Sequence, residues 1–317
     1  MGGGSMSSIV EVRALTKRFD ELVVVNDVSF SIEQGEVFGL LGPNGAGKTT
    51  TISMVSCLIE PTSGTIVVDG HDSAREPGAL KAALGVVPQE IALYPTLTAA
   101  ENLRFWGSMY GLRGDALKSA VADALELAGL ADRAKERVEK YSGGMKRRIN
   151  IAAGILHKPR VLLMDEPTVG IDPQSRNHIL ETVKDLNSAG MTVLYTSHYM
   201  EEVEYLCDRI AIMDHGVIIA EGTLNELRDV VGGMDVVAVK VADVTQQVLD
   251  RVRAIEGVES VKGAEDALEV LTRSSGSIMG RLVSTLESEG AHVTSVSVTE
   301  PNLESVFLHL TGKSLRD

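Results

Sequence analysis

The chain of 317 residues has only two cysteines, few aromatic residues and no long apolar run. Cys57 and Cys207 lie far apart without a CxxC spacing, which argues against a disulfide framework or a zinc site. Its longer uncharged stretches, such as 37–47 and 51–59, fall short of the roughly 18 to 20 apolar residues that span a bilayer. We therefore expect a cytosolic protein whose membrane role, if it has one, depends on a partner.

Basic residues are also in deficit. Lysine and arginine number 30 against 44 acidic residues, which gives a formal net charge of −14. A nucleic-acid-binding protein normally presents a basic face, so no nucleic acid is expected among the partners. The one short basic cluster, Lys146, Arg147 and Arg148, is interpreted as a solvated helix face.

Short apolar strands alternate with helices in the first part of the chain, which predicts an α/β domain with a largely parallel sheet. A wholly helical stretch at about 98–157 predicts a helical insert in this domain. Residues 1–5 resemble a tag remnant, so the first domain is assigned to 6–231. The predicted strands are 9–15, 22–32, 37–41, 65–68, 84–87, 161–164, 192–195, 209–213 and 216–220.

A second, smaller domain is predicted at 232–317, because Gly232 and Gly233 interrupt the pattern. Its order of elements is βαββαβ, the split arrangement of α+β ferredoxin-like domains. Pro301 is expected to open a last short helix. The predicted elements are strands 236–241, 258–262, 267–271 and 292–298 and helices 245–255 and 277–289.

A phosphate-binding loop is predicted at 42–49, where Gly-Pro-Asn-Gly-Ala-Gly-Lys-Thr matches GxxxxGK[ST] between a strand and a helix. Its glycines let backbone N–H groups converge on phosphate oxygens at a helix N-terminus. Lys48 is expected to reach the β- and γ-phosphates, and the Thr49 hydroxyl to coordinate Mg²⁺. The expected nucleotide-binding residues of this loop are Gly42, Asn44, Gly45, Ala46, Gly47, Lys48, Thr49 and Thr50.

Two acids follow the apolar strand at 161–164. Asp165 is the natural second Mg²⁺ ligand, and Glu166 is a candidate general base for a water in line with the γ-phosphate. In isolation the pair would be interpreted as solvated loop acids. The buried-looking strand before it and the phosphate loop elsewhere favour the catalytic interpretation.

A second helix start suited to an anion lies at Ser142, Gly143 and Gly144. Ser142 can cap the helix, and the glycines expose backbone amides. Taken alone, this segment would be an ordinary capped helix. Together with a single nucleotide motif, it raises the question of what the second anion site binds.

Over about residues 9–224 these motifs and their order resemble the nucleotide-binding subunit of ATP-binding-cassette (ABC) transporters. In that family the Ser-Gly-Gly signature completes the ATP site of the opposite subunit in a head-to-tail dimer. The resemblance implies a Mg²⁺-dependent ATPase with a second ATPase subunit, in a homodimer or heterodimer, and a membrane permease on a separate chain. It places the protein at the cytoplasmic face of the membrane, bound through that permease.

The resemblance also implies roles for four further residues. Phe19 stands where the family stacks a ring, usually tyrosine, on adenine. Gln89 matches the glutamine that contacts Mg²⁺ and the attacking water, and His198 matches the histidine that contacts the γ-phosphate. Asp172 closes a segment that resembles the loop crossing the dimer interface. Each of Phe19, Gln89 and His198 alone would be interpreted as structural.

Met145 in the signature and the C-terminal extension resemble the ABC-2 type, drug-resistance-like exporter branch, which implies export of a drug, lipid or similar hydrophobic substrate. The alternative is a soluble ABC ATPase acting on ribosomes or DNA. The C-terminal domain fits either a sensor that gates the ATPase or reinforcement of the dimer. Some of the aromatic residues of the insert are expected to line the permease groove, although core packing is an alternative: Tyr94, Phe105, Trp106 and Tyr110.

Overall fold

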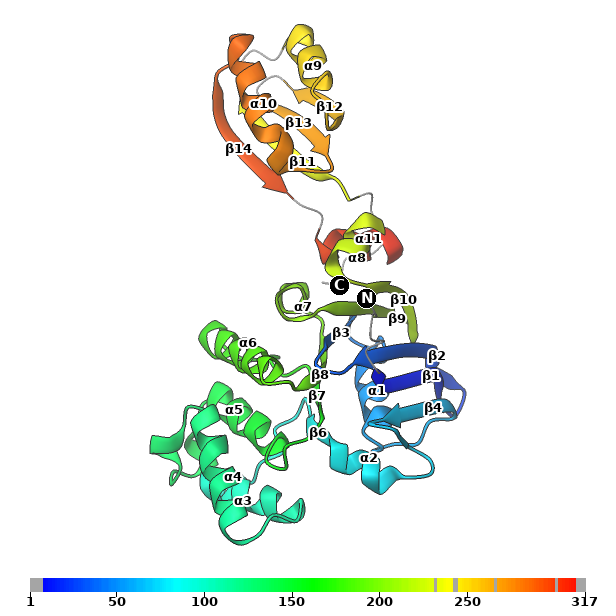
Figure 1. Ribbon diagram of the computed structural model, residues 1–317, viewed down its shortest axis with the longest axis vertical. Coiled ribbons are helices and arrows are strands. Elements are labelled where there is room, and N and C mark those ends of the chain that lie inside the picture. The colour runs from blue at the N-terminus through cyan, green and yellow to red at the C-terminus, as the bar shows by residue number, and fades with distance from the viewer. Residues whose placement is uncertain (1–7, 231–232, 242–244, 265–266, 300–301, 312–317) are drawn as a thin grey trace, which may run out of the picture. The chain divides into compact units, whose positions relative to one another are not determined.

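The computed structural model shows two compact units, Met1–Thr223 and Leu224–Asp317, each with its own hydrophobic core (Figure 1). The predicted tag remnant at 1–5, Gly232 and Pro301 all lie outside the residues that the structure describes. The described residues are 8–230, 233–241, 245–264, 267–299 and 302–311.

The centre of the first unit is a six-stranded sheet in the order β10-β9-β3-β8-β7-β6. All neighbouring strands are parallel except β10 and β9, which are antiparallel. The continuous apolar runs of β3 and β7 are buried at every position, as expected for parallel strands covered on both faces. The strands are β3 (Val37–Leu41), β6 (Leu84–Val87), β7 (Val161–Asp165), β8 (Thr192–Ser197), β9 (Arg209–Asp214) and β10 (Val217–Gly222).

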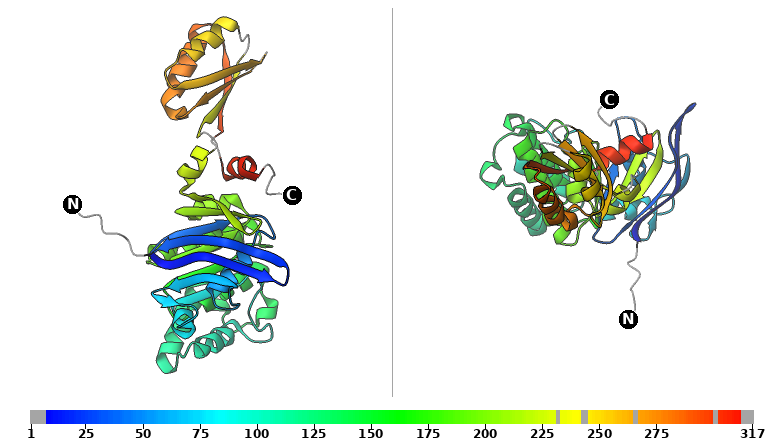
Figure 2. Two further views of the ribbon diagram at one scale, coloured as in Figure 1. Left: turned by 90° about the vertical axis from the view of Figure 1, so that its right-hand side faces the viewer. Right: turned by 90° about the horizontal axis from the view of Figure 1, so that it is seen from above.

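A separate antiparallel sheet, in the order β2-β1-β4-β5, packs against the first and had not been distinguished from it in the sequence pattern. The two sheets share one core, in which Phe30 of β2 stacks on Phe38 of β3 with ring centroids 5.3 Å apart. Figure 2 shows the long β1–β2 hairpin in blue. The strands are β1 (Ser8–Phe19), β2 (Leu22–Glu33), β4 (Ser63–Val68) and β5 (His71–Asp72).

The predicted helical insert is formed by α3 (Ala99–Met109), α4 (Gly114–Leu127) and α5 (Gly143–Gly154). It starts at a capping box, in which the Thr98 hydroxyl and the Glu101 side chain satisfy each other's backbone N–H groups. The other helices of the first unit are α1 (Lys48–Val55), α2 (Pro77–Ala83), α6 (Pro173–Ser188) and α7 (Met200–Leu206). No helix in the described ranges is long and apolar enough to cross a bilayer.

The second unit contains an antiparallel sheet in the order β12-β13-β11-β14, which is the strand order of a split βαβ fold. One core joins the sheet to its two helices. The predicted order of elements is therefore present in the structure. These elements are β11 (Asp235–Val241), α9 (Gln246–Arg253), β12 (Val258–Ala264), β13 (Ala267–Thr272), α10 (Ser275–Ser288) and β14 (Val293–Thr299).

Helix α8 (Leu224–Val230) also belongs to the second unit, whereas the sequence pattern had placed it at the end of the first domain. It contacts α11 (Leu303–Thr311), the last described helix of the chain. Leu227 of α8 and Leu303 of α11 are both buried. The division between the units therefore falls before α8, because its packing partner is distant in sequence.

We predict that Leu282→Ala destabilises the second unit by about 2–5 kcal/mol, because Leu282 is fully buried between α10 and the sheet. Amide hydrogen exchange should show faster exchange in 235–299 and unchanged protection in the six-stranded sheet. Ser284→Ala, at an exposed position of the same helix, is the control. Equal effects of the two substitutions would contradict the assignment of Leu282 to this core.

Candidate functional site

The loop from β3 to α1 has the shape of a phosphate cradle. Gly47 has a φ of 106°, a left-handed conformation that favours glycine, and a Cβ there would lie 2.9 Å from the Val24 carbonyl oxygen. A Cβ on Gly42 would lie 2.2 Å from the Met213 carbonyl oxygen. These positions have no room for a side chain, so this loop conformation before α1 requires glycine at both of them.

The loop borders a groove of about 210 Å³. Most of the residues predicted from the sequence to bind nucleotide lie there together, and Val24 of β2 joins them without having been predicted. The lining residues are Val24, Asn44, Gly45, Ala46, Gly47, Lys48, Thr49, Thr50, Gln89 and Glu166.

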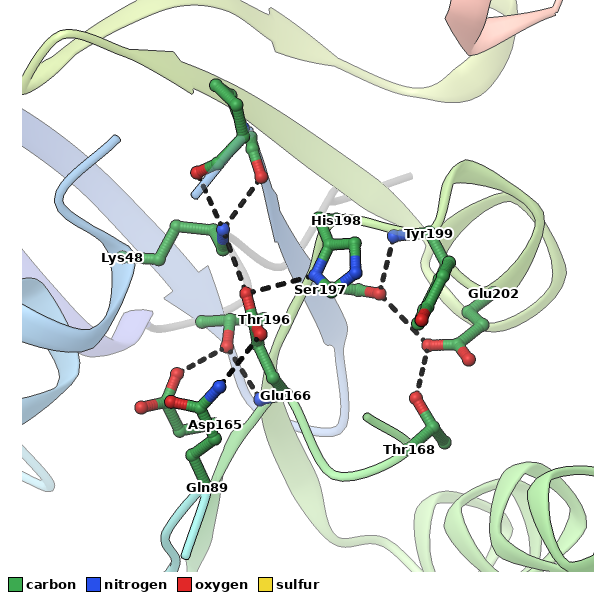
Figure 3. Close-up of polar contacts among 12 residues, drawn as sticks. Lys48, Gln89, Asp165, Glu166, Thr168, Thr196, Ser197, His198, Tyr199 and Glu202 are labelled. Atoms are coloured by element: carbon green, nitrogen blue, oxygen red, sulfur yellow. Dashed lines mark hydrogen bonds and ion pairs between the residues drawn. The ribbon is translucent and has the colours of Figure 1, made fainter. Parts of the chain in front are cut away.

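Lys48 is 4% exposed and bonds to its own loop and to the predicted base. Its Nζ donates to the carbonyl oxygens of Gly42 at 2.7 Å and Pro43 at 3.0 Å. The same atom lies 3.0 Å from Glu166 Oε1 (Figure 3). The charge of the lysine is thus held at the floor of the groove.

Glu166 is the point at which the predicted catalytic residues meet. Its Oε1 lies 3.3 Å from His198 Nδ1, and its Oε2 accepts a hydrogen bond from Gln89 Nε2 at 3.2 Å. Burial alone would raise the pKa of Glu166, but the hydrogen bond and charge of Lys48, with a contribution from His198, hold this pKa below its usual value. The lowered pKa favours the ionised carboxylate, which is the form that a general base requires.

Asp165 lies one residue earlier, at the end of β7, and is buried. Its Oδ1 accepts a hydrogen bond from Thr196 Oγ1 at 2.8 Å. Burial raises the pKa of Asp165, although hydrogen bonds from Thr196 and Thr49 oppose this shift. Asp165 and Thr49, two of the three predicted Mg²⁺ ligands, are thus in contact with each other.

Thr196 of β8 is a residue of the site that sequence reasoning missed. Besides its bond to Asp165, its Oγ1 accepts the backbone N–H of Glu166 at 3.0 Å. Glu166 has a φ of 43°, which is rare for a residue with a side chain, and Thr196 holds the backbone in that conformation. The available signal was a polar residue at the end of a buried strand.

The signature segment and Asp172 lie away from the groove lining. Ser142 caps α5, as predicted, and accepts the backbone N–H of Met145 at 3.3 Å. Asp172 caps α6 and accepts the backbone N–H of Ser175 at 2.9 Å, which lowers its pKa. The two helix starts are adjacent, since a Cβ on Gly144 would lie 2.0 Å from Ser175 Oγ.

Phe19 is 47% exposed at the β1–β2 hairpin and does not line the groove. The Lys17 Nζ lies 4.9 Å from the centroid of its ring. Its face is thus covered by a cation within the chain, and the predicted stacking on adenine stays a prediction.

The interpretation of the basic cluster as a solvated face is wrong for Arg147, which is 3% exposed. Its guanidinium donates to the carbonyl oxygens of Pro88, at 2.8 Å, and Gln89. Arg148 donates to the Ala128 carbonyl oxygen at 2.8 Å. Arg147 therefore fixes the loop that carries Gln89, because the carbonyl oxygens of this loop accept hydrogen bonds from its buried guanidinium.

A second groove, of about 350 Å³, lies beside the insert and is lined by Trp106, Tyr110, Ala92 and Asn150 among others. The Trp106 indole N–H donates to the Ala92 carbonyl oxygen at 3.1 Å. Of the four aromatic residues predicted there, Tyr94 and Phe105 do not line the groove. They are exposed and form edge contacts, Tyr94 with Phe105 and Phe105 with Trp106.

Comparisons with known proteins agree with this geometry. The family model described as "ABC transporter" matches residues 25–169, and the one described as "ATP-binding protein DrrA1-3-like, C-terminal domain" matches 222–311. The chain is 52% identical to the linearmycin resistance ATP-binding protein LnrL of Bacillus subtilis, over 98% of the chain and 100% of the relative. It is 38% identical to the Nod factor export ATP-binding protein I of Cupriavidus metallidurans, over 98% of the chain and 100% of the relative.

A solved relative shows the same fold for the first unit. It is the dimeric structure of an ATP-binding cassette in a post-hydrolysis state, bound to ADP and phosphate. The match has a TM-score of 0.62 and 26% identity, and it covers 68% of this chain and 98% of that one. With its phosphate loop, paired acids and signature segment, the chain belongs to the ATP-binding proteins of the ABC transporter family.

Proposed function

We propose that this ABC ATPase hydrolyses ATP with Mg²⁺ in sites shared by two copies and thereby drives export through a separate membrane permease. The observation that carries the proposal is the position of the Glu166 carboxylate at the edge of the phosphate-loop groove. The carboxylate is held there by Lys48, Gln89 and His198. A base in this position can orient and deprotonate a water that attacks a phosphate held by the loop.

The residues around Asp165 fit a magnesium ion. Mg²⁺ prefers oxygen ligands, and the Asp165 carboxylate, the Thr49 hydroxyl and the Gln89 amide oxygen supply them. Asp165 and Thr49 are already in contact, and Gln89 bonds to the adjacent Glu166. When bound, Mg²⁺ would neutralise charge on the phosphate oxygens. Lys48 supplies a second positive charge and the loop amides supply donors.

The second copy is proposed from the place of Ser142 and Asp172. Both cap helices that start beside each other, and neither lines the groove of its own chain. A helix start with exposed amides suits an anion, so ATP held by one copy would contact Ser142, Gly143 and Gly144 of another. The dimeric solved relative bound to ADP and phosphate supports this arrangement.

Export through a permease is supported by the names of the relatives, which refer to linearmycin resistance and Nod factor export. We propose a drug, lipid or similar hydrophobic cargo, and action at the cytoplasmic face of the membrane. The groove lined by Trp106 and Tyr110 is the proposed binding site for an apolar helix of the permease. Both the relatives and the acidic charge of −14 disfavour the alternative of a ribosome- or DNA-directed ATPase.

Lys48→Ala is expected to weaken ATP binding at least tenfold, because it removes the buried cation that would meet the phosphates. Titration of a fluorescent ATP analogue measures the affinity. Lys118→Ala, at an exposed lysine of the insert, is the control and should bind as the unmodified chain does. Unchanged affinity in Lys48→Ala would contradict the proposed site.

Glu166→Gln is expected to bind ATP while its steady-state turnover falls at least 100-fold, because an amide cannot accept the proton from water. The variant should accumulate as an ATP-bound dimer, since turnover no longer separates the copies. Phosphate release and light scattering measure the two properties. Turnover at the unmodified rate would rule out Glu166 as the base.

Tyr110→Ala is expected to reduce co-purification of the permease about fivefold or more, because the ring borders the proposed helix groove. Tyr205→Ala removes an exposed tyrosine outside the groove and is the control. Co-expression with the polytopic permease and quantitative blotting measure the effect. Equal recovery with both variants would show that the groove does not hold the permease.

A further inference from the structure

Glu202, in the first turn of α7, is a buried carboxylate outside the predicted site. It is 2% exposed, and its Oε2 accepts hydrogen bonds from three hydroxyl groups (Figure 3). The donors are Thr168 Oγ1 at 2.8 Å, Tyr195 Oη at 2.9 Å and Ser197 Oγ at 2.9 Å. Burying a charge is costly, and these three hydrogen bonds offset part of that cost at one of the two oxygens.

The guanidinium of Arg176 lies near the other carboxylate oxygen of Glu202. Arg176 Nε lies 3.4 Å from Glu202 Oε1, and the Arg176 guanidinium lies 4.7 Å from the ring centroid of Tyr199. Arg176 is in the first turns of α6, where its backbone N–H donates to the Asp172 carbonyl oxygen at 2.9 Å. Glu202 is therefore connected to the start of the helix that Asp172 caps.

The hydroxyl groups that donate hydrogen bonds to Glu202 belong to the two segments that carry the proposed catalytic residues. Thr168 follows Glu166 by two positions, and its carbonyl oxygen accepts the backbone N–H of Ile171 at 3.2 Å. The backbone N–H of Val169 also donates to the Glu166 carbonyl oxygen at 3.3 Å. The segment 166–171 thus forms two overlapping hydrogen-bonded turns, and the Thr168 side chain within it donates to the carboxylate of Glu202.

Ser197 forms the second connection, because it directly precedes His198. Its Oγ donates to Glu202 and accepts the backbone N–H of Tyr199 at 2.9 Å. Its carbonyl oxygen accepts the backbone N–H of Gly42, at the start of the phosphate loop, at 3.3 Å. Ser197 therefore joins Glu202 to both sides of His198 and to the nucleotide loop.

We propose that Glu202 is a positioning residue for ATP hydrolysis. Its carboxylate fixes the position of the Glu166 turn relative to the segment that carries His198. This keeps Glu166 Oε1 and His198 Nδ1 3.3 Å apart. Figure 3 shows Glu202 on the far side of Ser197 from Lys48, so it acts through these segments and does not touch the reacting atoms. The inference rests on the proposed roles of Glu166 and His198.

The test is Glu202→Gln in the full chain. The amide has the same shape, but its NH₂ group faces either the hydroxyl donors or Arg176, and the charge is lost. We expect kcat for ATP to fall roughly 10- to 100-fold while KM changes less than about twofold, because the phosphate loop and Lys48 are retained. A kcat within twofold of the unmodified chain would overturn the proposal.

Glu36→Gln is the matched control. Glu36 is also buried, at 8% exposed, and its Oε1 lies 3.1 Å from Arg209 Nη1, outside the site. If Glu202 only stabilises the fold, both variants lower the melting temperature and neither changes kcat in the folded protein. The proposal requires a loss of kcat in Glu202→Gln that Glu36→Gln does not show at comparable stability.

Thr168→Val tests the same link without changing Glu202, and it serves if Glu202→Gln does not fold. Removing the Thr168 hydroxyl should by itself lower kcat while KM changes little, and an unchanged kcat would overturn the proposal. Where Glu202→Gln folds, the double variant should lose less than the product of the two single effects. Independent, multiplicative effects would overturn the proposal. Wild-type turnover in Glu166→Gln would instead overturn the proposed role of Glu166, so the two failures are distinguishable.

Discussion

The ion pair between Lys48 and Glu166 is the interaction on which the site depends. Lys48 follows β3 and Glu166 follows β7, and β8 lies between these strands in the sheet. The pair therefore forms across the end of β8, whose Thr196 and the adjacent His198 fill the space between. Parallel strands make this arrangement possible, because their carboxyl ends meet at one edge of the sheet.

Both charges of the pair are nearly buried, and further hydrogen bonds offset the cost of burying them. Loop carbonyls take the other Lys48 donors, Gln89 occupies the second Glu166 oxygen, and Arg147 fixes the Gln89 loop from behind. Arg147 thus orders the Gln89 loop, and Gln89 in turn orders the Glu166 carboxylate. Glu202 lies further from the ion pair and accepts hydrogen bonds from the segments that carry Glu166 and His198.

Local patterns in the sequence predicted most strands, the phosphate loop and the paired acids, because each depends on residues that are close in the chain. Non-local packing was not predictable in this way. Helix α8 was assigned to the first domain because its contact with α11 is invisible in a local pattern. Arg147 and Glu202 lie among other charged residues, so both resemble a solvated helix face, and only the structure shows that they are buried.

In the proposed mechanism, ATP lies between the phosphate loop of one copy and the signature segment of another. A crystal structure of the chain with Mg²⁺ and a non-hydrolysable ATP analogue tests it most directly. We expect a dimer in which Lys48 of one copy and Ser142 of the other both contact the γ-phosphate, with Thr49 and Asp165 beside the metal. A γ-phosphate contacted by a single copy, or one bound outside the loop, would contradict it.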